Sequence, residues 1–253
     1  MNVRDQGVVV TGGASGLGRA TAVRFAKAGA KVAVLDRNEA LAAEVAKEIS
    51  GFAIGCDVSS GPAVEAAIGR AVKELGSIRV AVACAGIGWA GRLVGKEGPH
   101  PFEAFEKTLQ INLFGTFNLL RFAAAHMSKL EPLDTGERGV VIQTASVAAF
   151  DGQIGQIAYA ASKGAVVSMT LPAARELARF GVRVLTIAPG LFATPMMAGL
   201  PPEAQASLGA SVPFPARLGD PSEYAALAFH MAENPMLNGE VVRLDGALRM
   251  APK

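Results

Sequence analysis

The chain contains 253 residues, of which 51% are hydrophobic and 18% are charged. This charged share lies below the roughly 25% of an average domain, which excludes a disordered chain and indicates a large buried core. The 24 basic and 22 acidic side chains give a net charge of +2, without the basic stripe of nucleic-acid-binding proteins. Two cysteines give no disulfide framework.

The sequence also argues against a membrane protein. The longest uncharged apolar stretch near its C-terminal third, residues 184–202, contains Pro189, Gly190, Pro195 and Gly199, which interrupt a spanning helix. The N-terminus shows neither a signal peptide nor a transit peptide. We therefore expect an intracellular protein without a membrane or nucleic-acid partner. It would be cytoplasmic in a bacterium, and a mitochondrial location stays open for a eukaryotic source.

Short apolar segments alternate with longer helical segments along the chain. The short segments are continuously apolar, which is typical of strands buried on both faces of a parallel sheet; they cover residues 8–10, 32–35, 52–54, 80–83, 140–142, 182–187 and 241–244. Segments with helical apolar spacing cover residues 17–27, 39–49, 63–75, 102–129, 159–179 and 222–233. This alternation predicts an α/β fold in one domain over residues 1–253. We expect a doubly wound parallel sheet of about seven strands with helices on both faces.

A glycine-rich turn connects the first predicted strand to the first helix. Gly12, Gly16 and Gly18 lie in the sequence TGGASGLG. Such a turn lets the backbone approach a pyrophosphate, while the helix N-terminus directs free N–H groups and a positive dipole at the phosphates. A turn that only allows close packing of helix against strand is the alternative. Since no GK[ST] sequence follows, a mononucleotide P-loop is excluded.

Acidic residues follow the second and third predicted strands. Asp36 ends the second strand, where a carboxylate binds the ribose hydroxyls of NAD and repels the 2′-phosphate of NADP. The neighbouring Arg37 could bind that phosphate, but Asp36 comes first, so we expect NAD as the cofactor. Asp57 and Val58 follow the third strand. They either cap the next helix or hold the adenine, and the residues alone leave both roles open.

A tyrosine and a lysine lie four residues apart in the sequence YAASK. On a helix, Tyr159 and Lys163 share one face, and the ammonium favours the phenolate and lowers the pKa of the phenol. Ser146 follows the fifth predicted strand and could donate a hydrogen bond to a carbonyl oxygen. The alternative, an ordinary surface pair, is weakened by the order in which the glycine turn, the serine and this pair occur.

Two segments rich in Gly and Pro lie where a ligand could bind. The loop 95–101 follows the fourth predicted strand, at the end of the sheet where ligands bind, although a plain surface loop fits equally well. Residues 190–217 contain five prolines and little charge. We expect an irregular lid or substrate loop here, with an interface or packing segment as the alternative. The three histidines are isolated, so we expect no metal site.

These motifs together resemble the short-chain dehydrogenase/reductase superfamily. The resemblance rests on TGGASGLG, CAG at 84–86, Asn112, Ser146, YAASK and Pro189-Gly190, and it covers essentially the whole chain. Longer stretches, such as QTASVAAFDGQIGQIAYAASKG and NPMLNGEVVRLDGALRM, are similar to type-2 3-hydroxyacyl-CoA dehydrogenases, also called type-10 17β-hydroxysteroid dehydrogenases. The resemblance implies an NAD-dependent homotetramer of the Rossmann fold. It would interconvert (S)-3-hydroxyacyl-CoA and 3-oxoacyl-CoA, with hydroxysteroids as further substrates.

The resemblance also implies a role for each matching residue. Tyr159 would act as general acid/base, Ser146 would hold the substrate oxygen, and Lys163 would bind the nicotinamide ribose. Asn112 would complete a water-linked proton relay to Lys163. The residues expected at the cofactor, besides Tyr159 and Lys163, are Gly12, Ser15, Gly16, Leu17, Gly18, Asp36, Arg37, Asp57, Val58, Cys84, Ala85, Gly86, Pro189, Gly190, Phe192 and Thr194. Those expected at the substrate are Ser146, Gln153, Gln156 and Tyr159.

The sequence departs from the family pattern in two places. Ala83 stands where many relatives have Asn, so we expect a buried polar contact of that side chain with the sheet to be lost. The loop 95–101 is shorter than in the animal enzymes, which affects the expected substrate size. Two other functions remain as alternatives: an NADPH-dependent 3-oxoacyl-carrier-protein or small-ketone reductase, and a catalytically silent nucleotide-binding scaffold.

Overall fold

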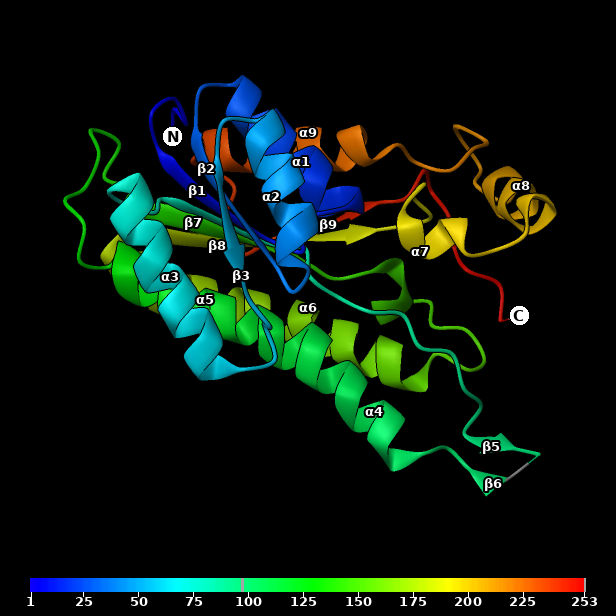
Figure 1. Ribbon diagram of the computed structural model, residues 1–253. Coiled ribbons are helices and arrows are strands. Elements are labelled where there is room, and N and C mark those ends of the chain that lie inside the picture. The colour runs from blue at the N-terminus through cyan, green and yellow to red at the C-terminus, as the bar shows by residue number, and fades with distance from the viewer. Residues whose placement is uncertain (97, 253) are drawn as a thin grey trace.

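One parallel sheet forms the centre of the computed structural model, which describes residues 1–96 and 98–252 (Figure 1). Its strands are β1 (Gly7–Thr11), β2 (Lys31–Asp36), β3 (Phe52–Gly55), β4 (Val80–Ala83), β7 (Gly139–Thr144), β8 (Val182–Pro189) and β9 (Val241–Leu244). They lie in the order β3-β2-β1-β4-β7-β8-β9, and every neighbouring pair is parallel. The seven predicted strands are confirmed. Every residue of β1, β4, β7 and β8 is buried, which explains their continuously apolar sequences.

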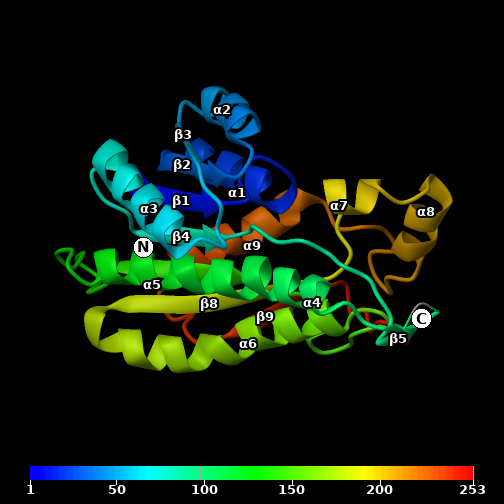
Figure 2. The ribbon, with the colours of Figure 1, turned by 60° about the horizontal axis from the view of Figure 1, so that its bottom comes forward.

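Helices cover both faces of the sheet. Figure 2 shows α1 (Gly16–Lys27), α2 (Glu39–Glu48) and α9 (Pro221–Glu233) on one face, and α3 (Gly61–Leu75), α5 (Gly115–Met127) and α6 (Ile157–Leu177) on the other. Successive side chains of a strand point to opposite faces. Val9 of β1 accordingly packs with α3 and α5, whereas Val8 and Val10 pack with α1 and α9. The predicted doubly wound α/β architecture is confirmed.

The segment 102–129, predicted as one helix, has a wider turn in its middle. It consists of α4 (Phe102–Leu109), a π-helical turn over Gln110–Phe114, and α5. A π-turn inserts one extra residue without ending the helix, so the apolar spacing on either side stays helical and does not reveal it. Asn112 lies in this turn and is fully buried.

Two segments expected to be irregular contain regular structure, so that part of the prediction is wrong. Within residues 190–217 the structure has α7 (Pro195–Ala198) and α8 (Pro202–Ala210), because proline favours the first position of a helix. The loop 95–101 contributes to a short antiparallel pair, β5 (Val94–Gly95) and β6 (Gly98–Pro99). Glu97 of this loop lies outside the described residues.

The strand order places a crevice at the carboxyl ends of β1 and β4. The chain proceeds from β1 outward to β2 and β3, and then returns to the other side of β1 with β4. In open α/β sheets, ligands bind where the order reverses in this way. Within the part of the chain that the structure describes, no helix is both long and apolar enough to span a bilayer.

Candidate active site

A cleft of about 840 Å³ lies over the carboxyl ends of the strands. The structure brings together there all the residues expected at the cofactor and the substrate. Of the residues singled out for the site, Asn112 alone lies behind the cleft wall. The site therefore draws on the glycine turn, on the ends of β2, β3, β4, β7 and β8, and on the first turns of α6.

The glycine turn is packed too closely for side chains at two of its positions. Gly12 has φ +64°, and a Cβ there would lie 2.7 Å from the Cα of Ala85. A Cβ on Gly18 would collide with the carbonyl oxygen of Gly12. Among the described residues, the Ser15 side chain caps no N–H of α1, and the first turn of α1 contains no acidic residue. The free N–H groups of that helix end can therefore receive a phosphate.

Backbone amides hold the carboxylate of Asp36 at the end of β2. The N–H of Ala14, in the glycine turn, donates to Asp36 Oδ2 at 3.2 Å, and the N–H of Asn38 donates to Oδ1 at 3.0 Å. The side chain is half-buried and lines the cleft, next to the exposed Arg37. A negative charge is thus fixed beside the turn, where the adenosine ribose of a dinucleotide lies.

Asp57 lies in the cleft and does not cap the next helix. Ser60 caps α3, because its Oγ accepts from the N–H of Ala63 at 3.3 Å. Asp57 Oδ1 instead accepts from the N–H and the hydroxyl of Ser59, at 2.9 and 2.7 Å, and these hydrogen bonds lower the pKa of the Asp57 carboxyl. The helix-capping role considered for Asp57 is therefore wrong.

Tyr159 and Lys163 face the cleft from the start of α6. Lys163 is 4% exposed, its Nζ lies 5.8 Å from the centre of the Tyr159 ring, and it donates to the carbonyl oxygen of Thr144 at 2.8 Å. Burial lowers the pKa of Lys163 to about 8. Burial raises the pKa of Tyr159, whereas the sequence predicted a pKa lowered by Lys163; the nearby Ser146 hydroxyl opposes this rise. Ser146 also caps the short turn after β7 by accepting from the N–H of Ala148 at 3.1 Å.

The buried Asn112 fixes the chain that leaves β4. Its Oδ1 accepts from the N–H of Ile87 at 2.8 Å, and its Nδ2 donates to the carbonyl oxygen of Ile87 at 3.0 Å and to the Oγ of Ser162 at 3.1 Å. Gly86 lets this chain pass, because a Cβ there would lie 3.2 Å from Asn112 Oδ1 and 3.5 Å from Lys163 Nζ. Asn112 thus connects the wall of the cleft to the helix that carries Lys163, and its part in a proton relay stays a prediction.

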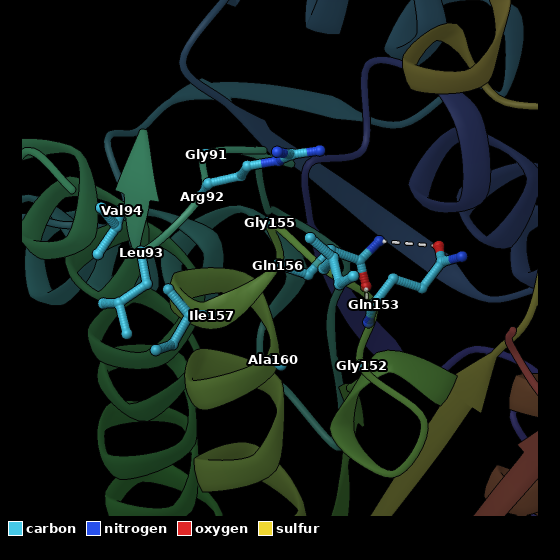
Figure 3. A pocket seen from close by; sticks show the side chains of 11 residues that line it. Gly91, Arg92, Leu93, Val94, Gly152, Gln153, Gly155, Gln156, Ile157 and Ala160 are labelled. Atoms are coloured by element: carbon cyan, nitrogen blue, oxygen red, sulfur yellow. Dashed lines mark hydrogen bonds between the residues drawn. The ribbon is translucent and has the colours of Figure 1, made fainter. Parts of the chain in front are cut away.

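A second hollow, of about 580 Å³, adjoins the cleft, and Gln153 and Gln156 line both. Figure 3 shows the two amides facing each other, and Gln156 Nε2 donates to Gln153 Oε1 at 3.4 Å. The N–H of Gly91 donates to the carbonyl oxygen of Gly155 at 2.8 Å and joins the two walls. The other lining side chains are mostly apolar: Arg92, Leu93, Val94, Ile154, Ile157 and Ala160.

A family model described as short chain dehydrogenase matches residues 6–205 of the chain. The chain belongs to the short-chain dehydrogenase family. It is 52% identical to the 3-hydroxyacyl-CoA dehydrogenase type-2 of Drosophila melanogaster, over 96% of this chain and 97% of that protein. The crystal structure of a 3-hydroxyacyl-CoA dehydrogenase type-2 from Mycobacterium avium is 43% identical and superposes with a TM-score of 0.93, covering 98% of this chain and 97% of that one. The resemblance inferred from the motifs is confirmed.

A second solved structure that resembles this chain bears on the cofactor. The 3-ketoacyl-(acyl-carrier-protein) reductase from Brucella melitensis, complexed with NADH, is 28% identical with a TM-score of 0.86, over 97% of this chain and 98% of that one. The family binds a nicotinamide dinucleotide. The residues of this chain fit such a group, because the close-packed glycine turn and the open N-terminus of α1 leave room for a pyrophosphate.

Sequence reasoning missed several residues of this short-chain dehydrogenase site. The low charge of residues 190–217 indicated a ligand segment without identifying which side chains reach the cleft, and nothing in the sequence pointed to the C-terminal residues. Across residues 1–96 and 98–252, no three His, Cys, Asp or Glu side chains gather as metal ligands do. The apolar lining that was missed includes Ile111, Leu191, Met196, Met197, Leu200, Leu208 and Met250.

Proposed function

We propose that the chain is an NAD-dependent oxidoreductase that interconverts (S)-3-hydroxyacyl-CoA and 3-oxoacyl-CoA, with hydroxysteroids as further substrates. The observation that carries this proposal is the convergence of Ser146, Tyr159 and Lys163 in the cleft that begins at the glycine turn. The relatives named 3-hydroxyacyl-CoA dehydrogenase type-2 match the chain from end to end, which supports the substrate class.

The cofactor would lie with its pyrophosphate over Gly12, Gly16 and the N-terminus of α1. Asp57 and Val58 would hold the adenine, and Thr194 with the backbone after Pro189 would hold the carboxamide; all of these residues line the cleft. The bound nicotinamide supplies a hydride in the reductive direction and accepts it in the oxidative direction. The protein aligns the reacting carbon with the nicotinamide ring and manages one proton.

Tyr159 would transfer that proton through its phenolic oxygen. When a 3-oxoacyl group is reduced, the hydride goes to the carbonyl carbon and the Tyr159 proton goes to the carbonyl oxygen, which becomes the hydroxyl. Ser146, which lines the same cleft as Tyr159, would donate to the same oxygen and orient it. The Lys163 ammonium, 5.8 Å from the phenol ring, stabilises the phenolate that remains. In the oxidative direction, the phenolate takes the proton back.

Asp36 would select NAD over NADP. Its carboxylate is held by two backbone N–H groups beside the glycine turn, so it cannot easily turn away from a ligand. The ribose hydroxyls of NAD can donate to it, whereas the 2′-phosphate of NADP would meet a fixed negative charge. The exposed Arg37 would have to compensate for that repulsion before NADP could bind well.

Residues 190–217 would form the substrate segment of a single nucleotide-binding domain, residues 1–253. Its helices α7 and α8, with the connection between them, bring Met196, Leu200 and Leu208 into the cleft, where they would contact the acyl chain. The second hollow, beyond Gln153 and Gln156, would take the part of a longer thioester that the cleft does not hold. Val94, which lines this hollow, directly precedes the loop 95–101, so the length of that loop would influence the accepted size.

We infer that the protein is located in the cytoplasm. The chain would assemble there as a homotetramer. The surface of α4, the π-turn, α5 and α6 exposes large apolar side chains that a monomer would leave in water: Phe102, Phe114, Phe117, Ile157 and Leu171. Large exposed apolar patches mark interaction surfaces, which supports an assembly of identical subunits through these helices.

The proposed function is tested by reducing acetoacetyl-CoA with NADH and with NADPH. We expect turnover that strongly prefers NADH, and a loss of about 10³-fold in kcat for Tyr159→Phe, because general acid catalysis contributes roughly 10²–10⁴-fold. The Phe variant keeps the ring and should bind NADH as tightly as the unaltered protein, which controls for folding. Full activity of Tyr159→Phe would contradict the mechanism. A strong preference for NADPH would favour a carrier-protein or small-ketone reductase, and nucleotide binding without any turnover would favour a silent scaffold.

A further inference from the structure

A buried chain of hydrogen bonds lies directly behind the floor of the cleft. Thr144, the last residue of β7, donates through Oγ1 to the carbonyl oxygen of Ala83 in β4. The same Oγ1 lies 2.7 Å from the hydroxyl of Tyr224 in α9, and the Sγ of Cys84 lies 3.7 Å from that hydroxyl. Tyr224 is fully buried. Groups from α9, from β7 and from the end of β4 therefore meet at one point under the site.

The directions of these hydrogen bonds follow from the Ala83 carbonyl oxygen, because a carbonyl oxygen can only accept. The carbonyl oxygen of Ala83 has no proton, so the Thr144 hydroxyl donates to it. That hydroxyl then has no second proton, and the contact between Thr144 and Tyr224 requires the Tyr224 hydroxyl to donate. The Tyr224 oxygen in turn accepts from the Cys84 thiol. The Thr144 hydroxyl also lies 3.8 Å from the Sγ of Cys84, a second and weaker acceptor. This set of hydrogen bonds needs both the phenol and the thiol in their neutral forms.

Burial favours those neutral forms. It raises the pKa of Cys84, and it raises the pKa of Tyr224 well above its usual value. The start of α9 is fixed as well, because Asp220 and Glu223 form a reciprocal capping box around the first turn. The Tyr224 hydroxyl therefore stays protonated and can donate, on a helix whose first turn is fixed by its cap.

Thr144 connects this chain to the active site. Its own carbonyl oxygen accepts the hydrogen bond from Lys163 Nζ at 2.8 Å. The side chain of Thr144 is held from two sides, by Ala83 and Tyr224, and the N–H of the peptide that carries this carbonyl donates to Ile187 at 2.8 Å. The carbonyl group therefore has little freedom to move. Because Lys163 is buried, a well-placed acceptor stabilises its charged ammonium form more than it would in water.

We propose that Tyr224 is a positioning residue for Lys163: through the Thr144 hydroxyl, it fixes the carbonyl group that anchors the Lys163 ammonium beneath the cleft. Its effect on catalysis rests on the proposed function, whereas the hydrogen-bond arrangement itself does not. The titratable groups around Lys163 are Tyr159 on its own helix, Cys84 after β4, and Tyr224 behind Thr144. Two of these three, Cys84 and Tyr224, belong to the series of hydrogen bonds around the Thr144 hydroxyl.

The experiment is the Tyr224→Phe variant, which removes one oxygen from a buried ring. Lysines labelled with 13C at Cε are titrated by NMR, and the Lys163 signal is identified by its absence in Lys163→Arg. In the unaltered protein we expect a titration midpoint near a pKa of about 8. In Tyr224→Phe the ammonium loses its fixed acceptor, so the midpoint should fall by about 0.7 pH unit, or about fivefold in the protonation equilibrium. An unchanged midpoint would overturn the proposal.

Thr170→Val is the matched control for a purely structural effect. Thr170 and Thr186 form another buried hydroxyl pair at 2.7 Å, between α6 and β8, and the valine keeps the shape of the side chain. Both variants should lower the Tm, but only Tyr224→Phe should move the Lys163 midpoint. If Thr170→Val moved it equally, the shift would report general loosening and would count against the proposal.

A pair of substitutions at Thr144 gives the answer if Tyr224→Phe does not fold. Thr144→Val removes the hydroxyl that joins Tyr224 to the backbone, and Thr144→Ser keeps it. The proposal requires the lower midpoint in the valine variant and the original midpoint in the serine variant; equal midpoints would overturn it.

With acetoacetyl-CoA, kcat should fall about fivefold in Tyr224→Phe while KM stays constant. Since the NMR titration needs no substrate, failure of the proposed function would appear separately, as absent turnover by the unaltered protein.

Discussion

The two ends of the cleft are built by different means. At the nucleotide end, the glycine turn lies against the backbone of Ala85, and two backbone N–H groups hold Asp36. At the substrate end, α7, α8 and the β5–β6 pair present apolar side chains with large exposed fractions, such as Met196 at 57% and Val94 at 76%. The first end is shaped by close backbone contacts and the second by partly exposed side chains.

This difference matches the ligands that the two ends would take. A dinucleotide is the same molecule in every turnover, so a rigid backbone cradle suits it. Acyl groups vary in length and bind through apolar area, which flexible side chains such as methionine can accommodate. Substitutions at the nucleotide end should therefore have large, general effects, and substitutions at the substrate end should have small effects that depend on the substrate.

The largest effect is expected from Gly12→Ala. The new Cβ would lie 2.7 Å from the Cα of Ala85, at a residue with φ +64°, so steric overlap adds to an unfavourable backbone conformation. We expect a loss of about 3 kcal/mol in the free energy of unfolding and NADH binding too weak to measure by fluorescence titration. Thermal unfolding with and without NADH checks both.

Gly69→Ala is the control for this prediction. Gly69 is exposed in the middle of α3, and nothing lies within 4 Å of a Cβ built there. Because alanine favours helix more than glycine does, this variant should gain about 0.5–1 kcal/mol and bind NADH normally. Normal nucleotide binding by Gly12→Ala would show that the turn is less rigid than its packing indicates.

An intermediate effect is expected from Asp36→Asn. The amide keeps the size of the side chain and removes the charge that would repel a 2′-phosphate. We expect the ratio of kcat/KM with NADH to that with NADPH to fall about tenfold, since removal of one like-charge contact near the surface is worth about 1–2 kcal/mol. The ratio is measured with acetoacetyl-CoA as the common substrate.

Asp57→Asn tests whether that change is specific. Asp57 lines the same cleft but would contact the adenine, which both nucleotides share. This variant should weaken NADH and NADPH equally and leave the ratio unchanged. A ratio that moves with Asp57→Asn and stays constant with Asp36→Asn would reverse the roles given to the two carboxylates.

The nucleotide end was predictable from the sequence because its signals are local. Gly12, Gly16 and Gly18 lie within one turn, and Asp36 is the last residue of a strand that is apolar because it is buried on both faces. Tyr159 and Lys163 are one helical turn apart, so their common face followed from their spacing. All of these residues lie in the cleft.

Contacts between distant segments could not be predicted in this way. We expected the sheet to lose a polar contact because Ala83 stands in place of Asn. The structure has a hydrogen bond at the same place, from the Thr144 hydroxyl to the Ala83 carbonyl. The hydroxyl of Tyr224 completes it from 80 residues further along the chain. No periodicity or local motif signals such a contact. The π-turn at Asn112 and the cleft position of Met250 escaped prediction for the same reason.

The smallest effect is expected at the substrate end, from Leu208→Ala. Leu208 is half-buried in α8 and lines the cleft, so its truncation should remove about 1 kcal/mol of contact with a long acyl chain. For long 3-oxoacyl-CoA substrates, KM should rise about fivefold at constant kcat, while both constants stay the same for acetoacetyl-CoA. Phe214→Ala, at a side chain that is 83% exposed and does not line the cleft, should change neither. Equal losses with short and long substrates would mean that Leu208 supports the fold of the catalytic centre, and the two ends of the cleft would then not be separable.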